Sequence, residues 1–433
     1  MSRMYLAAVQ RWFATRHNRI WRQGLARSGV VTMVTLCLLV LGLGVAYHEH
    51  MQGNIHKLKA KMGNEHEDVP VIKLGGQEAV SLMRTRMTGE STPEFLSATM
   101  LPGRGMNVLQ ITAYIPGKGE VNLLASPPIE AAAAALTGTG EDADGQRSLT
   151  MGGAFEVPWA DGIWGAGTAG GNHASTTWRG HVLTLPATGA AGAAASGGLM
   201  LAQGATSTGT TSLPDGGQAQ ATFEATDFGK RWPSKTQVTV TMLLSRGTIE
   251  LTVVALNSGD VAEPIGIGWR PRFAILDGNR EQMRLHIPAE RRVDVRNPET
   301  RAPTGSLVPV SGALSDLTLR DGAKLGSTEL NECFVDLHQN LLDSGPVTEL
   351  SDPANNYGLR LTVLSPTIKA LHVVAPANGD YVSIEPQYNL PDPFGREWTN
   401  GTDTGMVVLQ PGQSTEWKIR LELYSLANAG PEM

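Results

Sequence analysis

The chain has 433 residues, of which 50 are glycine and 25 are proline. This composition excludes a mostly helical protein and favours many short strands joined by turns. Apolar residues make up 41%, which supports a large core and argues against intrinsic disorder. The net charge is −6, but residues 1–27 hold six arginines and no acid, so the rest of the chain is strongly acidic and we exclude nucleic-acid binding.

The first predicted element is a membrane span. Ser28–Tyr47 reads SGVVTMVTLCLLVLGLGVAY, and 20 uncharged residues in a helix are long enough to cross a bilayer. The arginines before it predict a cytoplasmic N-terminus and an outside C-terminal domain, so we expect a single-pass protein of the bacterial inner membrane with its domain in the periplasm. The alternative is a cleaved signal peptide, although the basic segment and the apolar run are both longer than such signals usually are.

The segments beside this span are polar. Residues 1–27 alternate arginines with large apolar residues, a pattern that suits a basic amphipathic segment on the cytoplasmic leaflet and equally an unstructured flank. Residues 48–68 predict a short stalk. The only two cysteines, Cys37 and Cys333, are too differently placed to pair, so no disulfide framework is expected.

From residue 69 to residue 425 the pattern changes to short β-rich segments, and we predict one large all-β domain followed by a tail over 426–433. Several segments alternate apolar and polar residues, as half-buried antiparallel strands do. Residues 165–217 are rich in Gly, Ala and Thr and predict a loop insertion. The predicted strands are Asn107–Tyr114, Val121–Ala125, Gln237–Leu244, Thr248–Leu256, Leu359–Leu364, Val373–Val374, Tyr381–Ile384, Met406–Leu409 and Glu416–Leu423.

Five segments, in order along the chain, resemble motifs of the aldose 1-epimerase (galactose mutarotase-like) family. They cover about three-quarters of the chain, and the resemblance implies a large antiparallel β-supersandwich. The segments are MNVLQITAYIPGKGEVNLLAS (Met106–Ser126), TIELTVVALNSGDVAEPIGIGWRPRF (Thr248–Phe273), RAPTGSLVPVSGALSD (Arg301–Asp316), LNECFVDL (Leu330–Leu337) and YVSIEPQYNLPD (Tyr381–Asp392), before a closing PG-x-S…W strand.

The resemblance also implies a site for opening the ring of a sugar. That reaction needs a base for the proton of the anomeric hydroxyl and an acid for the ring oxygen, and the family uses a carboxylate and a histidine. The carboxylate position matches Glu385. Arg270 stands at the acid position, where a guanidinium cannot release a proton at neutral pH, so we expect it to pair with Glu385. His181 would replace the lost histidine if the preceding loop shifted its register.

The other site positions are matched more loosely. The family's sugar-contact positions fall on Asp161 and Asn331, with Glu332 beside Asn331 and Gln387 beside Glu385. The sequence predicts no cofactor and no metal, because His173 and His181 lack a third ligand at a suitable spacing. Aromatic residues that can stack on sugars cluster around the predicted cleft: Trp159, Trp164, Trp178, Trp269, Tyr388, Phe394 and Trp398.

Three functions follow from these patterns. The first is a membrane-anchored, epimerase-like protein that binds a carbohydrate and is catalytically weak or inactive. The second is an active aldose 1-epimerase that uses Glu385 as its base. The third is a non-catalytic accessory subunit of an integral-membrane complex, docked through its single span to other membrane subunits.

Overall fold

The computed structural model describes residues 72–87, 91–167, 173–187, 194–398 and 401–427. The predicted membrane span and the segments around it lie outside these residues, so they stay predictions. Within the described part of the chain, no helix is long and apolar enough to cross a membrane.

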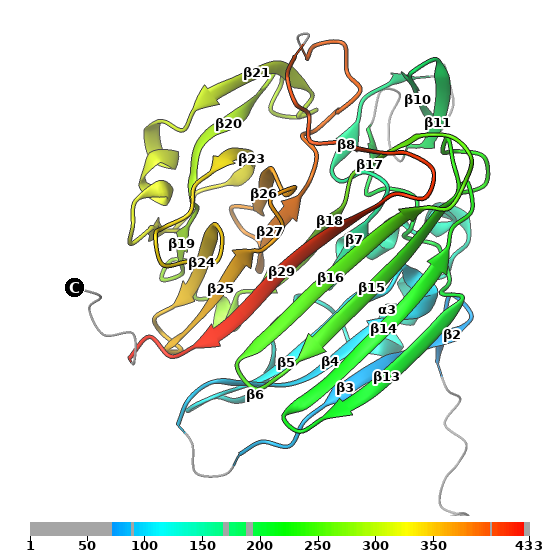
Figure 1. Ribbon diagram of the computed structural model, residues 1–433. Coiled ribbons are helices and arrows are strands. Elements are labelled where there is room, and N and C mark those ends of the chain that lie inside the picture. The colour runs from blue at the N-terminus through cyan, green and yellow to red at the C-terminus, as the bar shows by residue number, and fades with distance from the viewer. Residues whose placement is uncertain (1–71, 88–90, 168–172, 188–193, 399–400, 428–433) are drawn as a thin grey trace, which may run out of the picture. The chain divides into compact units, whose positions relative to one another are not determined.

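The described residues form a mainly antiparallel β-domain built on two large sheets (Figure 1), which confirms the predicted class. The first sheet has nine strands, in the order β13 (Ser207–Leu213), β14 (Gly216–Glu224), β15 (Thr236–Leu244), β16 (Thr248–Asn257), β29 (Ser414–Tyr424), β25 (Tyr357–Val363), β24 (Val347–Asp352), β19 (Arg284–His286) and β22 (Ala323–Lys324).

The second sheet has eleven strands, with β6 (Gly119–Asn122) attached to β5. Its other strands follow the order β21 (Pro303–Pro309), β20 (Ala289–Val295), β23 (Leu330–Leu337), β26 (Ala370–Ala375), β27 (Tyr381–Gln387), β18 (Gly268–Ala274), β7 (Gly153–Glu156), β5 (Asn107–Ile115), β4 (Glu94–Leu101) and β3 (Val80–Met83).

The main core lies between the two sheets. In β15 and β16 every second residue is buried, because the apolar residues of the alternating pattern face the other sheet. Trp417 on β29 makes an edge-on contact with Phe155 on β7, with ring centroids 6.4 Å apart. The indole N–H of Trp417 donates to the carbonyl of Pro386, 3.1 Å away, so one side chain ties the nine-stranded sheet to the strand that carries Glu385.

Residues 165–217, predicted as loops, contain strands in their described part. The expectation was wrong because Thr-rich and Ser-rich stretches pair with one another here despite their low complexity. These strands are β9 (Ala166–Gly167), β10 (His173–Trp178), β11 (His181–Pro186), β12 (Ala195–Ser196), which pairs with β8 (Gly162–Ile163), and β13, with β14 beginning at Gly216.

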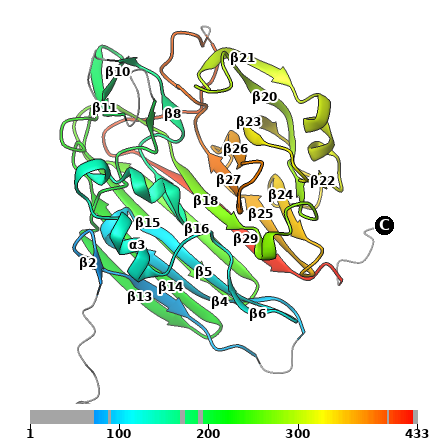
Figure 2. The same ribbon diagram turned by 180° about the vertical axis from the view of Figure 1, so that it is seen from behind.

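The remaining elements are short. The predicted strand Val121–Ala125 is shifted, since β6 ends at Asn122 and Leu124 makes a single bridge to Phe273. Helix α3 (Ile129–Ala135) is visible from behind in Figure 2. The others are β1 (Lys73–Leu74), β2 (Gln77–Glu78), β17 (Glu263–Ile265), β28 (Val407–Leu409) and 3-10 turns at Pro102–Arg104, Gly140–Asp142, Gln146–Thr150, Leu276–Gly278 and Gly312–Thr318.

Candidate functional site

One face of the eleven-stranded sheet carries polar side chains across four neighbouring strands. The antiparallel register of β18 and β27 places Arg270 at the level of Glu385. On the other side of β27, Glu385 is directly opposite His372 of β26, and Asn331 follows on β23. Alternate residues of a strand share a face, so the sheet itself brings these four side chains to one surface.

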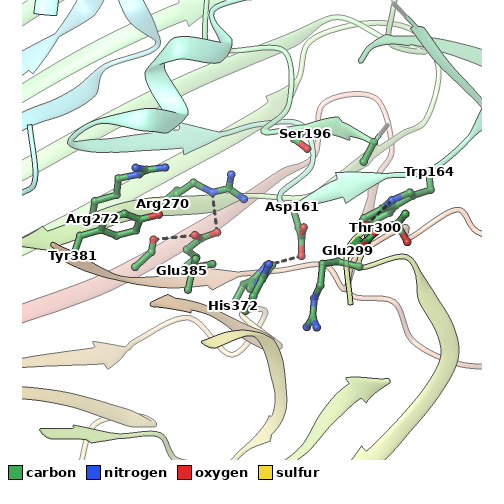
Figure 3. Close-up of a pocket in the computed structure, with 15 residues that line it drawn as sticks. Asp161, Trp164, Ser196, Arg270, Arg272, Glu299, Thr300, His372, Tyr381 and Glu385 are labelled. Atoms are coloured by element: carbon green, nitrogen blue, oxygen red, sulfur yellow. Dashed lines mark hydrogen bonds and ion pairs between the residues drawn. The ribbon is translucent and has the colours of Figure 1, made fainter. Parts of the chain in front are cut away.

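These residues form the floor of a cavity of about 500 Å³ (Figure 3), a size typical of small-molecule sites. One wall is formed by Trp164, just before the Gly/Ala/Thr-rich region 165–217, and by Ser196 within that region. A second wall is the turn between β20 and β21, with Glu299, Thr300 and Arg301. The indole N–H of Trp164 donates to the carbonyl of Thr300, 3.1 Å away, so the two walls touch.

The predicted pairing of Arg270 with Glu385 is confirmed. The Nε of Arg270 donates to Oε2 of Glu385 at 2.9 Å, and Glu385 is only 2% exposed. Oε1 of Glu385 accepts a hydrogen bond of 2.8 Å from the hydroxyl of Ser383. The carboxylate is therefore held in a fixed orientation on the cavity floor by two charge-assisted contacts.

Arg270 also has a second acidic partner that the sequence analysis missed. Oε1 of Glu156, on β7, lies 3.1 Å from the same Nε atom. Burial raises the pKa of Glu156 to about 7, with Arg270 lowering it and Glu385 raising it. Burial alone would lower the pKa of Arg270, but Glu156, Glu385 and Asp161 raise it above its usual value. Arg270 thus stays a cation, and Glu156 beside it keeps its proton up to a pH near 7.

A histidine in the cavity was also missed. Nδ1 of His372 lies 2.7 Å from Oδ2 of Asp161, and its Nε2 lies 2.8 Å from Oδ1 of Asn331. Burial alone would lower the pKa of His372, but the carboxylate of Asp161 outweighs it and raises the pKa above its usual value. With an acceptor at each ring nitrogen, the cationic form of the ring, in which both nitrogens donate, is the form that these contacts stabilise.

Asp161 and Asn331, both predicted to contact a sugar, line the cavity. The backbone N–H of Asp161 donates to Oε2 of Glu156 at 2.9 Å, which links the two acidic groups. Burial alone would raise the pKa of Asp161, but His372 and then Arg270 lower it below its usual value. Asp161 is therefore the counter-ion of His372.

Two predicted residues do not reach the cavity. Trp178 and His181 lie on the hairpin of β10 and β11 and stack on each other, with ring centroids 6.4 Å apart. This hairpin belongs to its own three-stranded sheet, so neither residue is among those that line the cavity. His181 does not replace the lost acid in this arrangement.

Glu332 and Gln387 lie beside the cavity without lining it. Glu332 pairs with Arg292 at 3.1 Å and with Arg301 at 3.3 Å, so it positions a residue of the wall. Gln387 is fully buried and donates to the carbonyl of Asn389 at 2.8 Å. Both are held by contacts within the protein beside the cavity.

Of the seven clustered aromatic residues, Trp164 lines the cavity, whereas Trp159, Trp269 and Tyr388 are fully buried. Among the described residues, no group of three or more His, Cys, Asp or Glu side chains is placed to hold a metal ion. The side chains that line the cavity include acids, bases and hydrogen-bond donors.

Comparison with known proteins fits this architecture. Residues 203–422 match the model of the aldose 1-epimerase family. The chain belongs to this family. A search of curated proteins finds no match.

Solved structures of other proteins share the fold of this chain. A galactose mutarotase-like protein from Clostridium acetobutylicum superimposes with a TM-score of 0.63 at 15% identity, over 80% of this chain and 98% of that one. A galactose 1-epimerase from Lactobacillus acidophilus gives a TM-score of 0.54 at 15% identity, over 80% and 99%. An aldose epimerase homologue from C. elegans gives 0.54 at 16%, over 76% and 95%. These structures establish the β-supersandwich fold.

His372 and Glu156 left a signal in the sequence that was not used. Each is a charged or titratable residue inside an apolar run, within ALHVV and AFEVPW respectively. Buried charges of this kind are rare unless they are paired. A search for ionisable residues inside predicted buried strands would have found both.

Proposed function

We propose that this chain binds the ring form of a carbohydrate in the cavity above Glu385 and Arg270. The observation that carries the proposal is the cavity floor, where charged and amide side chains from four adjacent strands face one space. Sugar hydroxyls both donate and accept hydrogen bonds, so a ring can satisfy such a mixed set of partners. Trp164 in the wall supplies an aromatic face of the kind that packs on apolar C–H groups.

The setting of this activity is part of the proposal. Ser28–Tyr47, with the arginines before it, predicts an anchor in the bacterial inner membrane and a periplasmic domain. The arginine at position 270 supports a binding role over efficient catalysis, because it cannot act as the general acid. Docking to other membrane subunits through the span is the alternative that leaves the cavity unused.

Binding is tested by calorimetric titration of the detergent-solubilised full-length chain with galactose, glucose and related monosaccharides. We expect Trp164→Ala to weaken the binding of the preferred sugar at least tenfold. Trp178→Ala is the matched control, since it removes an indole outside the cavity, and it should bind as the wild type does. Binding of no monosaccharide, or equal loss in both variants, would overturn the proposal.

A second candidate, an active epimerase, is favoured by His372. In this reaction Glu385 takes the proton of the anomeric hydroxyl while the bond from the anomeric carbon to the ring oxygen breaks. A sugar that displaces the amide of Asn331 from Nε2 of His372 places its ring oxygen to receive the imidazolium proton. When the ring closes again on the other face of the carbonyl carbon, the proton on the ring oxygen returns to His372 and Glu385 gives its proton to the new anomeric oxygen. No other reactant is needed.

Polarimetry of freshly dissolved sugar distinguishes the two candidates. If the chain is an epimerase, His372→Gln and Glu385→Gln should each lower the rate by about 10²–10⁴-fold, while sugar binding persists. The wild-type rate should also fall as the pH rises through the raised pKa of His372. An absent rate enhancement in the wild type would dismiss the epimerase and leave the binding proposal standing.

A further inference from the structure

Among the residues that the structure describes, Arg272 differs from the other cations of the site because no acidic side chain pairs with it. It lies two residues after Arg270 on β18, on the same face, and lines the cavity. Its guanidinium lies over the ring of Tyr381, 4.3 Å from the ring centroid. Figure 3 shows Arg272 and Tyr381 at one end of the cavity, with Trp164 and Thr300 at the other.

The remaining cations of the cavity are each neutralised. Arg270 pairs with Glu385 and Glu156, and His372 pairs with Asp161. Arg301, in the wall, pairs with Glu332.

No such contact exists for the guanidinium of Arg272 among the described residues, where it makes neither a hydrogen bond nor an ion pair. Among the described residues, the positive charge of Arg272 at this end of the cavity therefore has no acidic side chain in direct contact with it.

Such a charge is costly in a half-buried site unless an anion reaches it. Burial lowers the pKa of Arg272, and the nearby Tyr381, Glu385 and Asp380 do not offset this effect. The planar fork of a guanidinium matches a carboxylate or a phosphate with two parallel hydrogen bonds. The ring of Tyr381 holds the fork in place through a cation–π contact.

We propose that the carbohydrate bound here is negatively charged and that its carboxylate or phosphate binds Arg272. This inference rests on the proposed carbohydrate binding. Two residues along a strand span about 6.7 Å, so Arg272 lies roughly one sugar ring away from the Arg270–Glu385 pair. The anionic group is accordingly a substituent of the same ring that lies over Glu385, such as an acid or a phosphate on its exocyclic carbon.

The test is calorimetric titration of the full-length chain with matched neutral and anionic sugars. The probes are galactose against galacturonate, glucose against glucuronate, and glucose against glucose 6-phosphate. We expect one anionic series to bind about 10-fold to 100-fold more tightly than its neutral partner, as charge-assisted hydrogen bonds provide. The carboxylate and phosphate arms separate the two sources of the negative charge.

Two variants make the result specific to Arg272. Arg272→Gln should abolish the preference for the anion, so that the variant binds the anionic and the neutral sugar of each pair with affinities within a factor of about two of each other. Arg179→Gln is the matched control, because Arg179 also lies over an aromatic ring, that of Trp178 at 4.9 Å, but outside the cavity. It should keep the preference.

The outcomes separate the two proposals. Equal binding of neutral and anionic sugars by the wild type, or an anion preference that survives in Arg272→Gln, would overturn this inference while carbohydrate binding stands. Binding of no sugar, neutral or anionic, would overturn both.

Discussion

Strands β15 and β16 of the nine-stranded sheet and strand β27 of the eleven-stranded sheet are buried in different ways. In β15 and β16, buried and partly exposed residues alternate strictly. In β27, six consecutive residues are buried, from Val382 to Gln387. One face of β27 packs apolar residues into the core, and the other holds Ser383, Glu385 and Gln387 under the cavity walls.

This difference shows in which strand the chain buries polar groups, which costs free energy unless the groups are paired. An antiparallel sheet with one solvated face needs no buried polar group, and β15 and β16 follow that rule along most of their length. In β27 the second face is covered, so its polar residues must be paired to be tolerated. Glu385 and Ser383 meet this requirement within the site. The buried polar face of β27 is therefore where we propose the functional surface, whereas we regard the alternating sheet as a scaffold.

The largest effect should come from the scaffold. Trp417→Ala removes a fully buried ring between the two sheets, and we expect a loss of about 3–5 kcal/mol in the free energy of unfolding because a cavity remains. Urea denaturation followed by circular dichroism measures this loss. A loss below about 1 kcal/mol would contradict the view that the inner face of this sheet is the main stabilising contact.

A smaller effect concerns pH and belongs to the site. Glu156 has a pKa of about 7 in the folded chain, against 4.5 when unperturbed, so the folded state binds the extra proton between these values. This group therefore makes the free energy of unfolding fall as the pH rises from 4.5 through 7. Between pH 5.5 and pH 8 its contribution is a loss of roughly 2 kcal/mol.

The variant Glu156→Gln should remove that contribution. Urea denaturation of both proteins at pH 5.5, 6.5, 7.5 and 8 should show a shallower fall in stability for the variant. Parallel curves would mean that Glu156 is not buried as described. Parallel curves would also weaken the contrast between a site that holds buried charged groups and the alternating strands β15 and β16.

The smallest effects compare one hydroxyl in each region. Ser383→Ala removes a buried hydroxyl that is shared between the carbonyl of Pro271, at 2.5 Å, and Glu385, at 2.8 Å. We expect it to cost about 1 kcal/mol because buried acceptors lose their donor. Thr239→Val, on the partly exposed face of β15, should change stability by less than about 0.5 kcal/mol. Thermal unfolding of both variants checks the ranking, which equal losses would refute.

Much of the fold was predictable, because alternation with period two is a local property of the chain. The predicted strands Gln237–Leu244 and Thr248–Leu256 correspond to β15 and β16 within one residue at each end. The Gly/Ala/Thr-rich region was harder, since its strands are short and their pairing depends on partners elsewhere in the same segment. There, propensity alone predicts loops.

The site was predictable only in part. Glu385 and Arg270 were found together because both lie in motifs that resemble those of the family, and the structure places them 2.9 Å apart. Trp178 and His181, also predicted at the site, lie on a hairpin and do not line the cavity, since an aromatic or imidazole side chain does not reveal which hairpin leaves the sheet. Glu332 and Gln387 were near enough to shape the site but not to line it.

The sequence by itself determined the class of the domain, its strand periodicity and the exchange of an acid histidine for Arg270, since each of these is written in local patterns or motifs. Only the tertiary structure decided which ionisable groups meet. His372 and Asp161 are 211 residues apart in the chain, and their side chains lie 2.7 Å apart in the fold. Within the described part of the chain, no carboxylate pairs with Arg272, because of where its neighbours lie. The physical reason is that charge pairing and burial depend on distances across strands, which sheet register sets and sequence spacing does not.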